Sequence, residues 1–346
     1  QEMLVVLSKV RTAGEDHSAM LGQLETAITD SPENAEFLRW MGKDNFVFLG
    51  YAHYAADASA NTLQCSEGSG LGLLRQPQFS ACLAGIPPGL EAVAHRPASL
   101  TLVKTDVKST LHRQKYLDFV GVTCHDATGK TVGEHVFIGL YAMHVYHIST
   151  SDIPVVREKV AAVRQFCGFR PGGHADKTLV NVLETYPRDE LIEISAEALT
   201  RIAGDIVRLF EHPRVRVFLR DDFWGRYVSA LVYLPRDRAD TTTRKRIIAL
   251  LQETLKPQSI DYFLTVGESR LARLHLIARR GAASLPKPMP FSAAISFRIG
   301  SSASLLQLAV CRRGVNDFSI PRDTVSSAFS AASSRAIGRD CRIYRA

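Results

Sequence analysis

The amino-acid sequence predicts an α+β fold, in which amphipathic helices cover antiparallel sheets. Two observations carry this prediction. In several short segments of the 346-residue chain, apolar and polar residues alternate with a period of two, which is typical of half-buried strands. In other segments, apolar residues recur every three or four positions, which is typical of helices with one buried face.

The clearest strands lie within residues 213–238. Val215, Val217 and Leu219 alternate with polar positions that include Arg214, Arg216 and Arg220, and the alternation resumes from Val228 to Leu234. The sequence DDFWG at 221–225 separates the two runs and is typical of a turn. The segment therefore predicts a β-hairpin that ends at Pro235, a residue that cannot donate to a strand ladder.

Helices are predicted on both sides of this hairpin. Leu199, Ile202, Ile206 and Leu209 give one apolar stripe, and a second stripe runs through 243–255. Two further strands follow, with the sequences IDYFLTV and RLARLHLIA. The resulting order αββαββ is a circular shift of the ferredoxin-like βαββαβ unit, and we expect it to form one domain over residues 195–280.

The first part of the chain predicts a separate mixed unit. We expect an N-terminal helical segment over 1–32, an α+β domain over 33–150 and a helical connector over 151–194. The expected elements are helices at 2–29, 33–41, 154–166 and 176–186 and strands at 46–54, 100–105, 117–124 and 132–148, the last with a bulge or bend near Tyr141.

The last 66 residues differ from the rest in composition. Residues 281–346 hold nine of the 42 Lys and Arg residues but only three of the 35 acidic ones, so most of the net charge of +7 lies there. The remainder is close to neutral, which argues against nucleic-acid binding. Twelve of the 66 are Ser and sustained periodicity is missing, so we expect this tail to be poorly ordered, although 305–310 could form local structure.

Composition also bears on location. The chain has no apolar run long enough to span a bilayer, and it begins with Gln1 without a basic and apolar leader, so we expect an internal fragment of a cytoplasmic protein. The six cysteines are scattered and lack CxxC spacing, which favours free thiols over disulfides.

Several motifs resemble functional sites, but their context in the sequence argues against that function. Gly68, Gly70 and Gly72 resemble a dinucleotide loop, but no helix follows them, so a turn is the better interpretation. His144 and His147 would point to opposite faces of a strand and could not share an ion. The sequence therefore predicts no metal site and no catalytic residues.

One polar cluster remains as a candidate binding site. Lys104, His112 and Arg113 lie between two expected strands and could bind an acidic effector through charge-assisted hydrogen bonds. A solvated loop is the alternative. Arg188, with Asp189 or Glu190, is expected to anchor the start of a helix.

Eight blocks in the same order over residues 34–280 resemble the N-terminal, non-catalytic region of the large-subunit bacterial NAD-specific glutamate dehydrogenases. They are FLRWMGKDNFVFLGY (37–51), GLGLLR (70–75), VKSTLHRQKYLDFVGV (107–122), KTVGEHVFIGLY (130–141), IPVVREKVAAV (153–163), HADKTLVNVLETYPRDELIEI (174–194), FWGRYVSALVYLPRDR (223–238) and ESRLARLHLIAR (268–279). The candidate effector residues fall within or beside the third block.

The resemblance implies a PAS-like unit over 33–150 and an ACT-like regulatory unit over 195–280, truncated before a Rossmann-type catalytic domain. The parent reaction would be oxidation of L-glutamate by NAD to 2-oxoglutarate and ammonia. The fragment itself would bind no cofactor, would be inactive alone, and would act in homo-oligomer assembly and amino-acid sensing. The alternative is a stand-alone ACT-like amino-acid-binding protein.

The resemblance stops near Arg280, where the family continues towards the dehydrogenase domain. The composition of 281–346, with no Glu, is what a shifted reading frame of a GC-rich gene would give. A divergent linker is the alternative.

Overall fold

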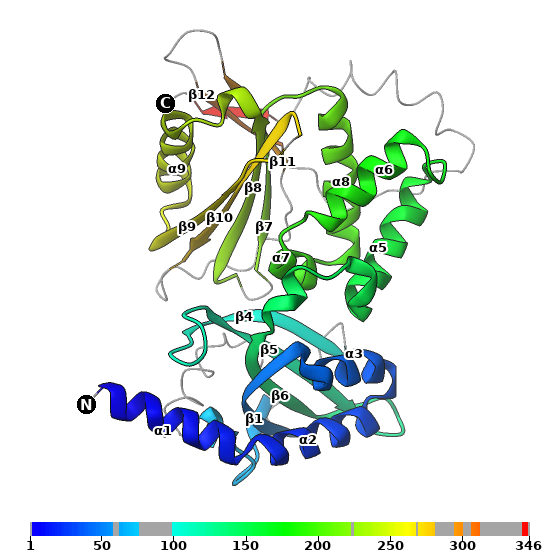
Figure 1. Ribbon diagram of the computed structural model, residues 1–346, viewed down its shortest axis with the longest axis vertical. Helices are drawn as coiled ribbons and strands as arrows, with labels where there is room; N and C mark the ends of the chain where they lie inside the picture. Colours follow the sequence, from blue (N-terminus) through cyan, green and yellow to red (C-terminus); the bar gives the residue numbers. More distant parts are fainter. Residues whose placement is uncertain are drawn as a thin grey trace. The chain divides into compact units, whose positions relative to one another are not determined.

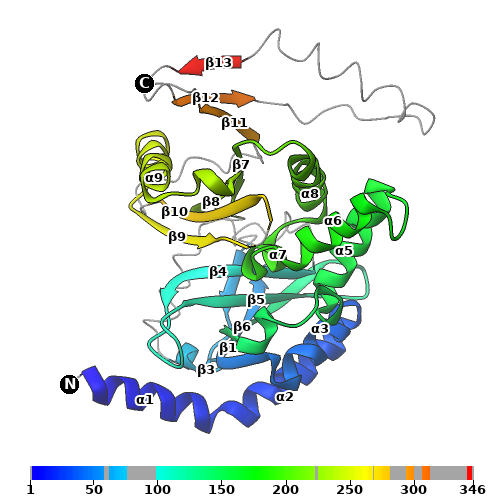
Figure 2. The same ribbon diagram turned by 45° about the horizontal axis from the view of Figure 1, so that its top comes forward.

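The computed structural model describes residues 2–57, 62–75, 99–222, 225–267 and 269–280, and the strands at 294–299, 306–311 and 341–344. The chain divides into two compact units, Gln1–Ala203 and Gly204–Ala346. Both contain helices and antiparallel sheets, which confirms the predicted α+β class (Figures 1 and 2).

The first unit begins with two helices rather than the single predicted one. They are α1 (Glu2–Glu15) and α2 (His17–Asp30), and buried Asp16 lies between them. The Asp16 carboxylate accepts a hydrogen bond of 2.7 Å from the backbone of Gly72 and pairs with Arg75. These long-range contacts tie the break between the helices to the sheet. The short helix α3 (Ala35–Trp40) follows as predicted.

Sheet A of this unit has the strand order β2-β1-β6-β5-β4, with β3 paired to β1. Its strands are β1 (Phe46–Asp57), β2 (Thr62–Cys65), β3 (Leu71–Gly72), β4 (Leu100–Lys108), β5 (Tyr116–His125) and β6 (Thr131–Tyr141). Each pairing is antiparallel. The PAS-like assignment of this unit stays a prediction.

The expected strand 132–148 is shorter than predicted. It ends at Tyr141, although the next residue, Ala142, still donates its N–H to the carbonyl of Asn45, the residue just before β1. A 3₁₀ turn then runs from Met143 to Tyr146. The chain thus leaves the sheet at the position where a bend was expected.

A helical connector follows sheet A. It consists of α5 (Pro154–Cys167), α6 (His174–Glu184) and α7 (Arg188–Glu193), after which α8 (Ala196–Glu211) crosses the boundary between the units. Helix α5 ends at Gly168, whose φ of 60° is readily adopted by glycine. Arg164 of α5 pairs with Asp176 of α6 at 3.1 Å.

The second unit contains the predicted hairpin as β7 (Arg216–Asp221) and β8 (Tyr227–Pro235), followed by α9 (Thr241–Leu255), β9 (Ser259–Thr265) and β10 (Leu271–Arg279). The strands are arranged β7-β8-β10-β9 and every pair is antiparallel. The last strand, β10, therefore lies inside the sheet, as a shifted first strand of a ferredoxin-like unit does.

The face of this sheet that packs on α9 is aliphatic. Val217, as predicted, is fully buried there in one cluster with Ile247 and Leu251 of the helix. Asp240 begins α9 by accepting a hydrogen bond of 2.6 Å from the backbone of Thr243.

Strand β9 lies at one edge of the sheet, next to β10. Its exposed side chains include Tyr262, Phe263 and Leu264.

Most of the tail after residue 280 lies outside the described residues. The expectation that this tail is poorly ordered falls on those residues and stays a prediction. Three strands in it are described, β11 (Ala294–Ile299), β12 (Leu306–Cys311) and β13 (Cys341–Tyr344). They extend the sheet from β7 in the order β13-β12-β11-β7. The run at 305–310, which the sequence allowed to be locally structured, falls largely in β12.

Candidate functional site

Lys104 of the candidate effector site lies in a buried ion-pair cluster of the first unit. It stands on β4 directly opposite Asp118 of β5, and its Nζ is 2.5 Å from Asp118 Oδ1. A second carboxylate, that of Asp189 in the first turn of α7, lies 3.0 Å from the same nitrogen. Tyr146 donates a hydrogen bond of 2.8 Å to Asp189. The cluster therefore joins the sheet to the helical connector.

The charges of this cluster do not balance, because two carboxylates face one ammonium group. Burial raises the pKa of Asp118 to about 6, with repulsion from Asp189 adding to the effect and attraction to Lys104 opposing it. The same carboxylates raise the pKa of Lys104 well above its usual value and outweigh the effect of its burial. Lys104 therefore stays charged, and Asp118 takes up a proton more readily than an exposed carboxyl.

Arg113 approaches the cluster from the turn between β4 and β5. Its guanidinium donates to the backbone carbonyl of Tyr141 and lies over the ring of Tyr146, 5.5 Å from the ring centroid. Its Nε is buried and has no hydrogen-bond partner within the described part of the chain. His112, on the same turn, is exposed and adopts a φ of 62°.

The structure thus brings two of the three expected effector residues together at Tyr146, and leaves the third at the surface. Sequence reasoning missed Asp118 and Asp189, which neutralise Lys104. A signal for Asp118 was available, because a single acid in the apolar strand LDFVGV predicts a buried and paired carboxylate. Asp189 could not be found in this way, since it is 85 positions from Lys104 in the sequence.

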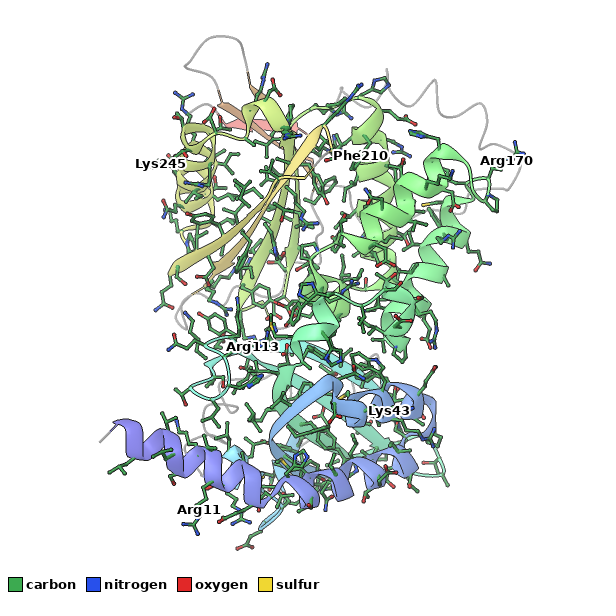
Figure 3. All side chains as sticks on the ribbon, in the orientation of Figure 1. Arg11, Lys43, Arg113, Arg170, Phe210 and Lys245 are labelled. Atoms are coloured by element: carbon green, nitrogen blue, oxygen red, sulfur yellow. The ribbon has the colours of Figure 1, made fainter. Side chains whose placement is uncertain are left out.

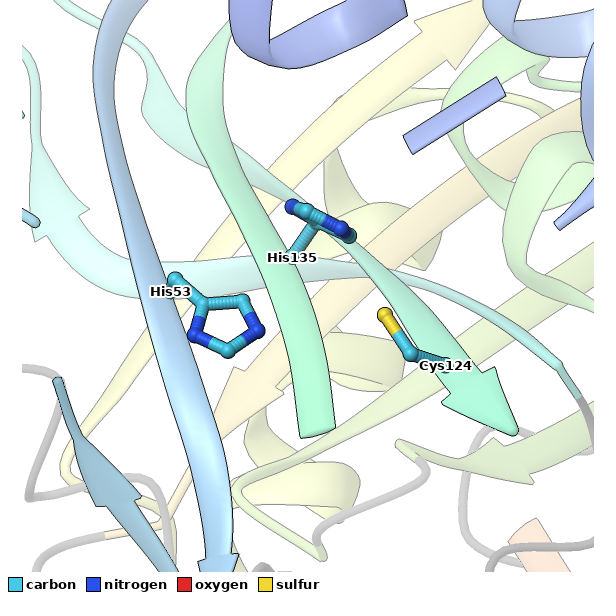
Figure 4. Close-up of side chains that lie close together, drawn as sticks. All are labelled: His53, Cys124 and His135. Atoms are coloured by element: carbon cyan, nitrogen blue, oxygen red, sulfur yellow. The ribbon is translucent and has the colours of Figure 1, made fainter. Parts of the chain in front are cut away.

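A second group of chemically active side chains lies on sheet A. His53 of β1, Cys124 of β5 and His135 of β6 place their ligand atoms within 4.8 Å of one another (Figure 4). Burial raises the pKa of the Cys124 thiol to about 11, with the nearby Asp30 carboxylate adding to the effect. A protonated thiol is a poor nucleophile, so this group does not resemble a cysteine catalytic site.

The motifs set aside in the sequence have structural partners. Gly72 has a φ of 58° and pairs with Gly50. A Cβ added to Gly72 would lie 2.3 Å from the Leu49 carbonyl oxygen. The glycine run therefore forms a tight turn into β3. His144 lies on the 3₁₀ turn and not on a strand, and bonds Asn45 at 2.8 Å. Arg188 is buried at the start of α7 and donates to the carbonyl of Ile148.

The second unit carries polar side chains on the sheet face away from α9. Ser229 of β8 and His275 of β10 are hydrogen-bonded at 3.0 Å, and the Arg279 guanidinium lies 5.5 Å from the ring centroid of Tyr227. Figure 3 shows the side chains of both units on the ribbon. None of the described helices combines the length and apolar character needed to cross a bilayer.

Comparisons with known proteins agree with the resemblance found in the sequence. Residues 153–212 match the family model for glutamate dehydrogenase, helical motif 1, and residues 216–295 match that for glutamate dehydrogenase, ACT2 domain. The second match spans β7 to β10 and reaches into β11.

Three bacterial NAD-specific glutamate dehydrogenases are similar to this chain. That of Halomonas elongata is 35% identical over 296 residues, which cover 80% of this chain and 18% of the relative. That of Pseudomonas aeruginosa is 33% identical over 293 residues, with the same coverage. That of Mycobacterium tuberculosis is 28% identical over 288 residues, covering 79% of this chain and 17% of the relative.

The chain spans less than a fifth of the length of these relatives. The matches fit the N-terminal region of the large NAD-specific glutamate dehydrogenases, as the sequence predicted.

Proposed function

We propose that this chain is a non-catalytic segment of an NAD-specific glutamate dehydrogenase, in which it serves regulation and subunit assembly. The observation that carries the proposal is the match of residues 216–295 to the ACT2 domain of that family, over strands that form one antiparallel sheet backed by α9. The parent enzyme would oxidise L-glutamate with NAD in the cytoplasm. Binding of NAD and hydride transfer belong to the part of the relatives that this chain does not match.

The first test is for turnover. We expect the purified chain to show no glutamate-dependent reduction of NAD, measured as the appearance of NADH absorbance, at any concentration that gives a folded circular dichroism spectrum. A full-length relative in the same buffer is the positive control. Turnover by this chain above a heat-inactivated sample would contradict the proposal.

We further propose that the cluster at Lys104, His112 and Arg113 binds a small acidic effector. Lys104 is already neutralised by Asp118 and Asp189, so the charge offered to a ligand comes from Arg113. Arg113 is partly exposed and pairs with no carboxylate of the described residues, and a ligand carboxylate would supply that partner. His112, exposed on the same turn, would contact the outer end of such a ligand.

Isothermal titration with amino acids and dicarboxylates tests this site. We expect saturable binding of at least one acidic compound, and Arg113→Ala should weaken it by about 1.5–3 kcal/mol, the range for a charge-assisted hydrogen bond. Arg170→Ala, which changes an exposed arginine of the same unit, is the matched control and should bind as wild type. Equal affinity in Arg113→Ala and wild type would move the site elsewhere.

Self-association is the remaining part of the proposed function. ACT-like units that act in assembly would hold copies of the chain together, so light scattering after size exclusion should give a mass above that of one 38.1 kDa chain. A monomer that still binds an amino acid would favour the alternative, a stand-alone amino-acid-binding protein.

A further inference from the structure

The strand register of sheet A brings three metal-binding side chains to one face. His53 of β1 is directly opposite His135 of β6. On the other side of β6, His135 is opposite Val122 of β5, so Cys124, two residues further on, points to the same face as Val122. Two imidazoles and a thiol from three neighbouring strands therefore converge on one point, with His135 in the middle (Figure 4).

Hydrogen bonds hold both imidazoles in defined orientations. His53 Nδ1 is 2.9 Å from the hydroxyl of Ser66, which leaves its Nε2 as the available nitrogen. His135 Nδ1 is 2.7 Å from the hydroxyl of buried Tyr51, so Nε2, which faces Asp30, is the nitrogen on that ring that could bind a metal. Metal-binding histidines in proteins are oriented in this way, by a hydrogen bond to the nitrogen that does not bind the metal.

A carboxylate lies beside this group, next to His135. Asp30 Oδ2 lies 3.1 Å from His135 Nε2, and the same carboxylate also influences His53 and Cys124 electrostatically. Asp30 is the last residue of α2, where the partial negative charge of a helix C-terminus disfavours an acid. A bound cation beside Asp30 would remove this unfavourable interaction.

The environment suits a metal held without much water. Cys124 and His135 are 6% and 3% exposed, and His53 is half-buried. With a divalent ion, the Asp30 carboxylate, whose side chain is 44% exposed, and a Cys124 thiolate would leave the site without net charge.

We infer that His53, Cys124 and His135, with Asp30 as the fourth ligand, form a binding site for one Zn²⁺ ion. Two nitrogens, a sulfur and a carboxylate oxygen are a donor set that Zn²⁺ takes in tetrahedral geometry. Ligand atoms around such an ion lie roughly 3.3–3.8 Å apart, so the three side chains would close in by about 1 Å through rotation of their side-chain bonds.

Binding changes the protonation of the group in a balanced way. The S–H bond of Cys124 breaks, its electron pair goes to the metal, and the proton is released to solvent. The proton that His135 Nε2 donates to Asp30 in the free protein moves to Nδ1 by exchange with solvent, where it is donated to the Tyr51 hydroxyl. One proton is released for each metal ion bound.

The inference is tested with the full chain, stripped of metal by a chelator and titrated with Co²⁺ and then Zn²⁺. We expect one Co²⁺ per chain with visible absorption of tetrahedral intensity and a thiolate-to-cobalt charge-transfer band, and loss of both on adding Zn²⁺. Zn²⁺ should also raise the melting temperature of the chain, because it binds only the folded site. A wild-type chain that shows no stoichiometric Co²⁺ or Zn²⁺ binding overturns the inference.

Variants identify the ligands. Cys124→Ser should remove the charge-transfer band, and His53→Gln, a change at a half-buried position, should weaken Zn²⁺ binding at least tenfold. The matched controls are His125→Ala, which changes the exposed histidine next to Cys124, and Cys65→Ser, which removes an exposed thiol; both should bind as wild type. Tyr51→Phe removes a supporting hydrogen bond and should weaken binding by about 10–100-fold.

The outcomes separate the site from other thiols of the chain. Circular dichroism shows whether each variant is folded, and if Cys124→Ser is not, the decision rests on His53→Gln. Metal binding that persists unchanged in folded Cys124→Ser or His53→Gln places the ion elsewhere and overturns the assignment.

Discussion

The sheet face that packs on α9 in the second unit and sheet A of the first unit bury different kinds of side chain. In the second unit, the cluster between α9 and the sheet consists of Val, Ala, Leu and Ile only. In the first unit, sheet A buries aromatic rings together with ionisable groups, among them Asp118, Glu134 and His135. An aliphatic cluster tolerates no charge, whereas a buried polar group depends on its partner and on its protonation state. The same kind of substitution should therefore have different consequences in the two units.

The largest effect is expected in the aliphatic cluster. Val217→Asp would place an unpaired carboxylate where the wild-type side chain is fully buried against α9. Such a group costs several kcal/mol, roughly enough to unfold a marginal domain. Thermal melting of the chain should show loss of the second unit, and a melting curve like that of wild type would mean that this face is not a closed core.

Removing one partner of the buried ion pair should have the next largest effect. Lys104→Met keeps the length of the side chain but leaves Asp118 and Asp189 without their ammonium group. Breaking a buried pair in this way costs about 3–5 kcal/mol of unfolding free energy. Urea unfolding at pH 7.5 measures it, with Lys108→Met, on the same strand but less enclosed, as the control.

The pH dependence of the cluster sharpens the comparison further. The pKa of Asp118 is raised from 3.8 to about 6 in the folded protein, so between these values the folded state binds more protons than the unfolded one. The contribution of Asp118 to stability should therefore decrease as pH rises through this window, by on the order of 2 kcal/mol. Urea unfolding from pH 4 to pH 7 gives the unfolding free energies of wild type and Asp118→Asn. The unfolding free energy of wild type minus that of the variant should decrease as pH rises, and a difference that does not change with pH would contradict the raised pKa.

A small effect is expected on the other face of β7. Arg216 lies next to Val217 in sequence but is partly exposed, and it pairs with Asp205 at 3.4 Å. Exposed ion pairs contribute about 0–1 kcal/mol, so Arg216→Ala should shift the melting transition only slightly. A loss as large as that of Val217→Asp would show that the two faces of the strand are not as different as the structure indicates.

The difference between the units also explains what the sequence could predict. In the second unit, the phase of Val217 and the extent of α9 follow from periodicity, because apolar spacing alone determines which side chains face the helix. In the first unit, the break at Asp16 between α1 and α2 depends on a contact with Gly72, and no local pattern records it. The pairing of β6 with β1, which opposes Tyr141 to Phe46, likewise joins residues almost a hundred positions apart.

The candidate sites also depend on contacts between residues that are distant in the sequence. Lys104 and Arg113 could be selected as cations near strand ends, but their neutralising partners come from the strand register and from α7. His53, Cys124 and His135 are distant in sequence and meet only because β1, β6 and β5 are adjacent in that order. Motif spacing detects ligands on one local element, whereas these three lie on separate strands.

The bare edge at β9 has a consequence for how the chain behaves in concentrated solution. Tyr262, Phe263 and Leu264 are exposed in a row on a strand with high β-propensity, and the neighbouring strand covers only one of its two sides. Edge strands of this type template the addition of further strands, and natural proteins usually interrupt them with lysine or proline. The only charged side chain within β9 is that of Asp261, and it faces Arg279. We therefore expect this strand to promote association of the chain in concentrated solution, and Phe263→Lys to reduce it.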